Sequence, residues 1–367
     1  MNATTRPRAD VRATRLLTVD AHDGRIALAN VDALAELFGP GDVFVVNDAA
    51  TLPASLTGIS AVGESIEARL AGEREDGTFL AVLFGAGDWH QPTERRPPPP
   101  VLAVGDELRF GSLAATIAAV APDSSRLVRL QFDTSGPELV RALYRAGSPI
   151  QYSYLERPLA IWDVQTPFAN RPWAVEPPSA ALPLSWELVH RLRARGVAIA
   201  RITHAAGLSS TGDATLDRRL PFRERYDVPI DAVVTIANAT GRVVAAGTTV
   251  VRPLESAAEG GELAAGSGWT ALRIGPDHVP RVVAAVLTGM HEPGTSHFDL
   301  LCAFAPATLL EAATQRAARA GLLSHEFGDL MLLSGDGERA RIRPAAGAGA
   351  AVASDHHHHR RAHAAPS

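Results

Sequence analysis

Lysine, cysteine and long apolar runs are missing or nearly missing from this chain. None of its 367 residues is a lysine, so all 35 of its Lys and Arg positions are arginine. Alanine, glycine and proline are abundant as well, and we therefore attribute the arginine content to compositional bias and not to phosphate binding. The single cysteine, Cys302, excludes internal disulfides and a cysteine-based zinc site, and its apolar surroundings predict a buried structural thiol.

Signatures of several common enzyme classes are also absent. The chain has no Walker A loop, no Gly-x-Ser-x-Gly elbow, no His-Glu-x-x-His and no Rossmann fingerprint, which argues against nicotinamide chemistry in particular. The run His356–His359 has no carboxylate partner, so we expect no metal site. No apolar run reaches membrane-spanning length and the first residues lack an apolar core, so we expect a cytoplasmic protein. The net charge of −5 gives no overall attraction to nucleic acid.

The texture of the sequence predicts one domain inserted into another. Between residues 60 and 147, short alternating apolar runs are separated by Gly, Asp and Pro, which is typical of a small β-barrel. Outside this segment, strand and helix patterns alternate. We therefore expect a mixed α/β main domain built from residues 1–59 and 148–343, an inserted small β-barrel-like domain at 60–147, and a disordered tail at 344–367.

Individual elements of the main domain can be predicted from local signals. Asp23-Gly24 between two apolar runs predicts a hairpin over residues 16–28. Residues 42–48 read as a buried strand with a polar end, and residues 186–196 as a helix with Ser185 at its N-cap. The segment 230–239 fits either a helix or a strand. Residues 330–334 and 340–342 predict a last hairpin.

One strand end carries more polar groups than a turn needs. The apolar run Val243–Ala246 ends in a glycine and two threonines, and Pro253 suits the first turn of a helix, so we expect a helix to start at Arg252. A helix start attracts a carboxylate or phosphate, and Arg252 can add a bidentate contact. The alternative is an Arg252–Glu255 pair across one helical turn. The candidate ligand-binding residues here are Gly247, Thr248, Thr249, Arg252 and Glu255.

Two histidines stand where active-site residues often lie in α/β folds. His204 and His291 each follow an apolar run and precede a glycine-containing loop. The alternative interpretation for both is a hydrogen-bonded loop histidine without a catalytic role.

Short motifs in a fixed order connect these pieces. Over residues 12–335 the chain resembles the S-adenosylmethionine:tRNA ribosyltransferase-isomerase family of queuosine biosynthesis. The motifs that carry the resemblance are "GD" at 41–42, "ND" at 47–48, "QT" at 165–166, "GTT" at 247–249, "LES" at 254–256, "LT" with His291, and "FGD" at 327–329.

The resemblance implies S-adenosyl-L-methionine as ribosyl donor and tRNA as partner. In that family the ribosyl group is transferred to a 7-aminomethyl-7-deazaguanine base and rearranged to an epoxycyclopentanediol, while adenine and methionine leave. Such a transferase and isomerase needs a base and an acid. We expect a monomer. The resemblance places the cofactor against Gly247, Thr248, Thr249, Arg252, Glu255 and His291, and leaves Asp48, His204 and Glu224 as catalytic candidates.

Several family motifs are altered in this chain. The family's "NDTRVIPARL" reads "NDAATLPASL" at residues 47–56, without either arginine, and its "APTAGLHF" reads "PPSAALPL" at 177–184, with Pro183 in place of the histidine. Loss of the arginines removes phosphate contacts, and proline cannot transfer a proton. Two alternatives therefore stand beside the family reaction: a small-molecule acceptor, or a non-catalytic binding protein on the same fold. We interpret the basic cluster at 218, 219, 223 and 225 as a solvated face.

Overall fold

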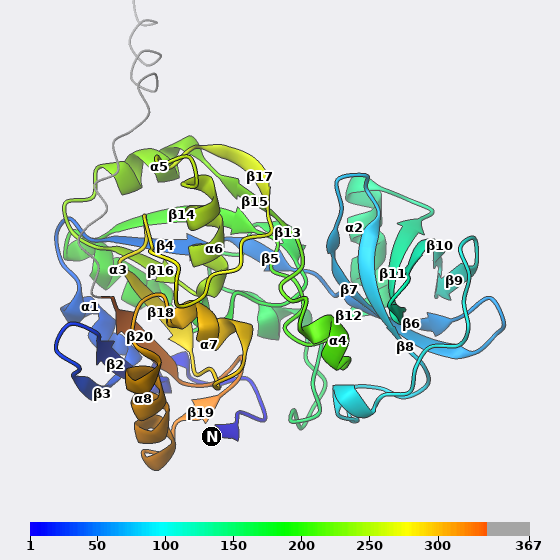
Figure 1. Cartoon of the computed structure of the whole chain (residues 1–367), viewed down its shortest axis with the longest axis horizontal. Helices are drawn as coiled ribbons and strands as arrows, with labels where there is room; N and C mark the ends of the chain where they lie inside the picture. The colour runs from blue at the N-terminus through cyan, green and yellow to red at the C-terminus, as the bar shows by residue number, and fades with distance from the viewer. Residues whose placement is uncertain (336–367) are drawn as a thin grey trace, which may run out of the picture.

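A nine-stranded mixed sheet forms the centre of the larger domain in the computed structural model, which describes residues 1–335 (Figure 1). Four neighbouring strands, β14, β4, β16 and β18, run parallel, and the strands at both sides add antiparallel pairs. The sheet order is β17 (Gly266–Thr270), β15 (Glu224–Val228), β14 (Ala198–His204), β4 (Val43–Asn47), β16 (Val243–Ala246), β18 (Ala285–Gly289), β20 (Leu330–Ser334), β2 (Arg15–Asp20) and β3 (Ile26–Asn30).

Helices cover both faces of this sheet. Val45 packs with helices α5 to α8, whereas Phe44 and Val46, which point to the other face, pack with α1 and α3. A strand that is buried on both faces reads as a continuous apolar run, which explains the predicted strand at 42–48. The helices are α1 (Leu34–Leu37), α2 (Gly136–Ala146), α3 (Trp186–Ala194), α4 (Ala214–Asp217), α5 (Ile230–Ala237), α6 (Thr248–Ala257), α7 (Ser296–Leu301) and α8 (Ala307–Arg319).

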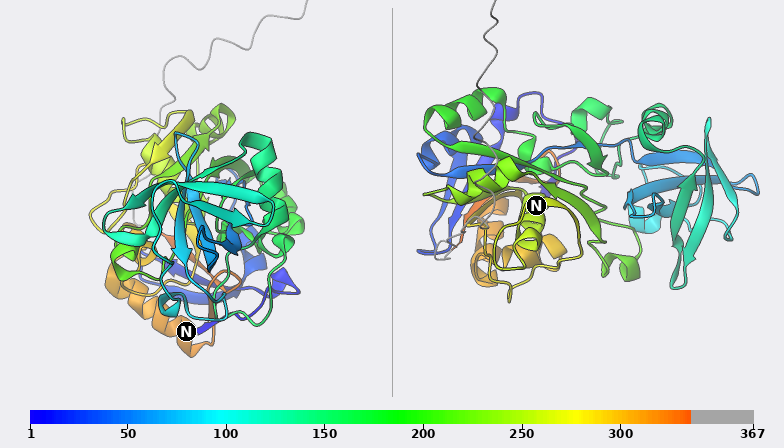
Figure 2. Two further views of the ribbon diagram at one scale, coloured as in Figure 1. Left: turned by 90° about the vertical axis from the view of Figure 1, so that its right-hand side faces the viewer. Right: turned by 90° about the horizontal axis from the view of Figure 1, so that it is seen from above.

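A closed six-stranded barrel lies beside the main sheet at one end of the molecule (Figure 2). β6 pairs with β7 on one side and with β9 on the other, and this closes the ring. β6 precedes residue 60 and β12 reaches past residue 147, so the barrel sheet extends beyond both ends of the segment expected to form it. The strands are β6 (Ser55–Ile59), β7 (Ser65–Glu73), β8 (Phe79–Phe84), β11 (Ser124–Phe132), β10 (Leu113–Ala121) and β9 (Glu107–Phe110), with β12 (Gly147–Ser148) added to β6.

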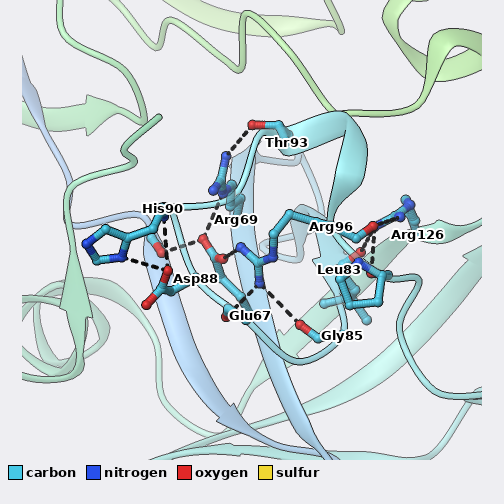
Figure 3. A network of polar contacts seen from close by, with 12 residues as sticks. Glu67, Arg69, Leu83, Gly85, Asp88, His90, Thr93, Arg96 and Arg126 are labelled. Carbon is cyan, nitrogen blue, oxygen red and sulfur yellow. Dashed lines mark hydrogen bonds and ion pairs between the residues drawn. The ribbon is translucent and has the colours of Figure 1, made fainter. Parts of the chain in front are cut away.

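A buried charged network lies between strand β7 of the barrel and the loop that carries Arg96 (Figure 3). Glu67 pairs with both Arg69 and Arg96, and the Nε atom of Arg69 lies 2.7 Å from the Glu67 carboxylate. One carboxylate thus faces two guanidinium groups, and the Arg69 guanidinium also lies 4.9 Å from the centre of the Phe84 ring and 5.5 Å from that of Tyr152. Through Tyr152 this network reaches the main domain.

Ion pairs join the barrel to the main sheet. Of the four arginines that we interpreted as a solvated face, Arg219 and Arg223 are exposed and Arg225 is partly exposed, and each of these three also reaches a carboxylate of the barrel. The pairs are Arg219 with Asp123, Arg223 with Glu75 and Arg225 with Glu73.

The remaining short elements link the two parts or cap the sheet. β5 (Ala49–Thr51) pairs in parallel with β13 (Arg171–Ala174), and β1 (Asn2–Ala3) pairs with β19 (Leu323–Ser324). Single turns of 3-10 helix occur at Val11–Ala13, Val31–Ala33, Thr93–Arg95, Ile161–Val164 and Ser179–Ala181.

The structure corrects or completes several local predictions. The helix expected to start at Arg252 starts at Thr248, and Pro253 lies inside it. The ambiguous segment at 230–239 is helix α5. Cys302 is partly exposed at the end of α7 and not buried. The second half of the predicted last hairpin, at 340–342, and the tail lie outside the described residues.

Candidate active site

The carboxyl ends of the four parallel strands meet at one edge of the main sheet. β14 ends at His204, β4 is followed by Asp48, β16 by Gly247, and β18 leads to His291. β15 runs antiparallel to β14, so its first residue, Glu224, reaches the same edge. In open α/β sheets, ligands bind outside the carboxyl ends of the strands. The fold therefore brings predicted site residues from five strands to the position where a ligand is expected.

Helix α6 opens directly at this edge. Gly247 has a φ of +101°, a conformation that L side chains rarely adopt, and a Cβ atom there would lie 3.5 Å from the side chain of Ala180. The chain can therefore turn from strand to helix without a loop, and Thr248 becomes the first helical residue. The first amide groups of a helix have no acceptor within it. Pro253 also has no N–H to give to the carbonyl of Thr249.

A buried glutamate joins three elements at the site. The Glu224 carboxylate accepts a hydrogen bond of 2.7 Å from the amide of Gly207, pairs with Arg252 Nη1, and lies 2.9 Å from His204 Nε2. Burial by itself would raise the pKa of Glu224, but the charge of Arg252 and the contact with His204 outweigh it and lower the pKa to about 2. A Cβ atom at Gly207 would lie 2.7 Å from this carboxylate, so a larger residue there would have to displace it.

Three buried polar atoms on β14 and in the first two turns of α6 have no partner among the described residues. They are Arg252 Nη2, His204 Nδ1 and Thr249 Oγ1. The Nε atom of Arg252 donates to the carbonyl of Leu272 at 3.0 Å, which fixes the guanidinium and leaves Nη2 free. Buried polar atoms in folded proteins nearly always have partners. These atoms are therefore available to hydrogen-bond a ligand that carries oxygen or nitrogen groups. We call Glu224, His204, Thr248, Thr249 and Arg252 the Glu224 cluster.

A pair of histidines lies next to the Glu224 cluster. His291 Nε2 is 2.8 Å from the Thr288 hydroxyl, and the His291 ring is stacked on the ring of His297, with centroids 4.8 Å apart and planes 10° apart. Burial, followed by the neighbouring His297 and His325, lowers the pKa of His291 well below its usual value near 6.5. His291 is therefore neutral at neutral pH and able to accept a proton.

An acidic and aromatic cluster continues from these histidines. The His325 ring stacks on Tyr154 at 4.2 Å, and Tyr154 lies 5.9 Å from Tyr152 between ring centres. The Tyr154 hydroxyl donates to Glu326, and that of Tyr152 donates to Glu176. Burial, together with the negative charge of Glu326, raises the pKa of Glu176 to about 7. We call Tyr152, Tyr154, Glu176 and Glu326 the Glu176 cluster.

Two predicted site residues have their carboxylates occupied within the protein. Asp48 accepts hydrogen bonds from the Thr203 hydroxyl at 2.6 Å and from the Asn170 side chain at 3.2 Å. Glu255 accepts the backbone amides of residues 281–283 at 2.8 to 3.1 Å and is 1% exposed. The expected alternative of an Arg252–Glu255 pair is not formed, because Arg252 binds Glu224.

Four residues of this region were missed by the sequence analysis: His297, His325, Glu176 and Glu326. His297 follows His291 by six residues, and His325 and Glu326 directly precede the "FGD" motif, so their closeness to recognised motifs was a usable signal. Glu176 carried no such signal, because only the folded chain places it against Tyr152.

Residues 1–335 contain neither a cluster of metal ligands nor a membrane-spanning helix. No group of three or more His, Cys, Asp or Glu side chains is placed to hold a metal ion there. Nor does that part of the chain contain a helix with the length and apolar character needed to cross a bilayer.

The chain can now be assigned to a protein family. A sequence model of the family described as "Queuosine biosynthesis protein" matches residues 2–333, and the chain belongs to this family. Two relatives, one from Anaeromyxobacter dehalogenans and one from Thermus thermophilus, carry the name S-adenosylmethionine:tRNA ribosyltransferase-isomerase. They are 35% and 34% identical to this chain; the matches cover 88% and 84% of it, and 92% and 89% of the relatives.

A solved structure of the same family is also similar. The crystal structure of an S-adenosylmethionine tRNA ribosyltransferase from Thermotoga maritima matches with a TM-score of 0.49 and 24% identity, over 90% of this chain and 95% of the other.

Proposed function

We propose that this chain is an S-adenosylmethionine-dependent ribosyltransferase-isomerase that modifies tRNA in queuosine biosynthesis. The observation that carries the proposal is the set of three unpartnered buried atoms, Thr249 Oγ1 and Arg252 Nη2 in the first two turns of α6 and His204 Nδ1 at the end of β14. The names of the relatives support S-adenosylmethionine as donor and tRNA as acceptor.

The residues present fit S-adenosylmethionine. The molecule has a carboxylate and ribose hydroxyls, which are the groups that a helix N-terminus, a free guanidinium nitrogen and a threonine hydroxyl bind. Thr248 and Arg252 are four residues apart in α6 and so lie on the same side of the helix. When bound, S-adenosylmethionine supplies a ribosyl group activated by its sulfonium.

The residues around the donor have distinct tasks in this proposal. Glu224 stays ionised at every working pH, since its pKa is about 2, and therefore keeps Arg252 fixed and charged. His291 is neutral and accepts a proton. Glu176, with a pKa of about 7, carries a proton in a substantial fraction of molecules at neutral pH and can give it to a leaving base.

Calorimetric titration with S-adenosylmethionine tests the donor site. Thr249→Val keeps the shape of the side chain and removes only the free hydroxyl, so we expect a five- to twentyfold weaker affinity, or about 1–1.8 kcal/mol. Arg252→Ala removes a charged donor and is expected to weaken binding about 100-fold. Arg193→Ala, on an exposed part of α3, serves as control and should bind like the unchanged protein.

Mass spectrometry then tests the reaction. Adenine and methionine should be released when tRNA carrying 7-aminomethyl-7-deazaguanine is present, and not with unmodified tRNA. Release with the free deazaguanine base alone would instead identify a small-molecule acceptor. Binding without release under any of these conditions would contradict the proposal, as would equal affinity in all four proteins.

A further inference from the structure

The His291–His297 stack is built from two elements that meet beside a charged pair. His291 follows β18, and its ring is held by the Thr288 hydroxyl at 2.8 Å, whereas His297 lies in the first turn of α7. The rings are nearly parallel, with centroids 4.8 Å apart. Two positive charges at this separation would repel each other strongly in a half-buried position. The stack can therefore hold one proton easily, but not two.

The charged groups around the stack act differently on its two rings. Glu224 from β15 favours a proton on His297, although burial and Arg252 from α6 oppose it, and the net effect is a lowered pKa. The groups of the described chain that act on His291 are His297 and His325, and both oppose a proton there. The first proton taken up on acidification therefore enters His297, and its charge then keeps the second ring neutral.

We propose that His297 is a positioning residue of the active site, which fixes the His291 ring by stacking and keeps it in the neutral, proton-accepting form. The inference rests on the proposed function, because it concerns the residue that accepts a proton at that site. His297 lies in neither the family motifs nor the predicted site, so it adds a residue to the machinery of this particular chain.

As a consequence, His291 is kept from being protonated when the pH falls. As the pH falls, His297 takes up the proton that would otherwise neutralise the function of His291. The range of pH in which His291 can accept a proton therefore extends further to the acid side than that of a single histidine in the same place.

Histidine titration by NMR tests this without any substrate. The ring signals of ¹⁵N-histidine-labelled full-length protein are followed from pH 5 to 8, and His291 and His297 are assigned from the signals lost in single variants. His297→Phe keeps an aromatic ring for stacking and removes the proton site, and His297→Gln removes both. We expect the His291 midpoint to rise by at least half a pH unit in each variant. The control, His190→Phe on the exposed face of α3, should leave it unchanged.

The pH dependence of adenine release provides the second readout. The acid limb of kcat/KM should move to higher pH in His297→Phe by the same amount as the NMR midpoint, and His190→Phe should not move it. An unchanged His291 midpoint in both folded His297 variants would overturn the inference. So would a loss of activity with an unmoved acid limb, because that is what a purely structural residue would give. If the unchanged protein releases no adenine, the proposed function fails, while the NMR result still decides whether the pair shares one proton.

Discussion

Two glutamates at opposite ends of the same site, Glu224 buried and Glu176 partly buried, titrate in opposite directions. Glu224 has its pKa lowered to about 2, and Glu176 has its pKa raised to about 7. Burial acts on both in the same sense, since it penalises the charged form. The difference lies in the neighbours: Arg252 and His204 lower the pKa of Glu224, whereas the like-charged Glu326 raises the pKa of Glu176 against the lowering effect of the Tyr152 hydrogen bond.

The comparison shows that local charge balance, and not depth, decides what each carboxylate can do. Glu224 is a permanent anion that holds a cation in place. Glu176 is a group that changes protonation near neutral pH and is suited to proton transfer. One fold thus provides a fixed charge and a titrating acid within a single connected strip of side chains.

The largest expected effect on this comparison comes from neutralising the Glu224 carboxylate. Glu224→Gln leaves the Arg252 guanidinium buried without its counter-charge, so we expect a loss of about 3–5 kcal/mol in the free energy of unfolding at pH 7. The control is Glu187→Gln, whose side chain is 59% exposed and pairs with Arg12, and it should cost less than about 0.5 kcal/mol. Urea denaturation measures both.

The same variant has a defined pH signature. Because the folded pKa of Glu224 lies below its usual value of 4.5, its stabilising contribution is fully present above 4.5 and is lost as the pH falls through about 2. The stability difference between Glu224→Gln and the unchanged protein should therefore shrink over this window. A difference that stays constant from pH 5 to pH 2 would contradict the assigned charge state.

The titrating carboxylate should show the opposite signature at smaller amplitude. The folded pKa of Glu176 is raised, so its contribution is fully present below 4.5 and is lost as the pH rises through about 7. The glutamine in Glu176→Gln is neutral at every pH, so this variant does not lose that stabilising contribution. We expect the variant to gain about 2 kcal/mol relative to the unchanged protein between pH 4 and pH 8, a value reduced from the full shift because the side chain is partly exposed.

A matched control isolates this effect. Glu262→Gln changes an exposed glutamate of the same type, and its stability difference should be independent of pH over the same range. Equal pH profiles for Glu176→Gln and Glu262→Gln would show that Glu176 titrates normally.

The smallest expected effect comes from removing one hydrogen bond to Glu176. Tyr152→Phe removes the hydroxyl that donates to Glu176, a bond that favours the ionised form, so the Glu176 midpoint should move further upward and stability should fall by about 1 kcal/mol. Carbon-13 NMR of the carboxyl groups reports the midpoint. Tyr144→Phe, whose hydroxyl bonds the carbonyl of Thr51, should leave that midpoint in place.

Much of the fold could be predicted from the sequence, because its signals are local. The hairpin over 16–28 and the helix after Ser185 are confirmed: β2 pairs with β3, and the Ser185 side chain accepts the amide of Leu188. The start of α6 was placed four residues too late, because Pro253 was taken for a first-turn residue. The positive φ of Gly247 lets the helix begin directly after the strand, but a glycine in the sequence does not by itself reveal this conformation.

The site was predictable only in part, for a different reason. His204 and Arg252 could be found from strand ends and Glu224 from the family resemblance, but their mutual contacts join β14, β15 and α6 across the sheet edge. The opposite pKa shifts of Glu176 and Glu224 depend on neighbours distant in sequence. The spacing of residues along the sequence does not identify such neighbours. The types of the site side chains could therefore be predicted, but their protonation states could not.

Helix α6 is connected through Glu255 to the segment that precedes β18. Its first turn offers the free donors at Thr248 and Thr249, and two turns later Glu255 binds the backbone of residues 281–283, which lead into β18. β18 in turn leads to His291. Any displacement of α6 would therefore be passed through Glu255 to the strand that leads to His291.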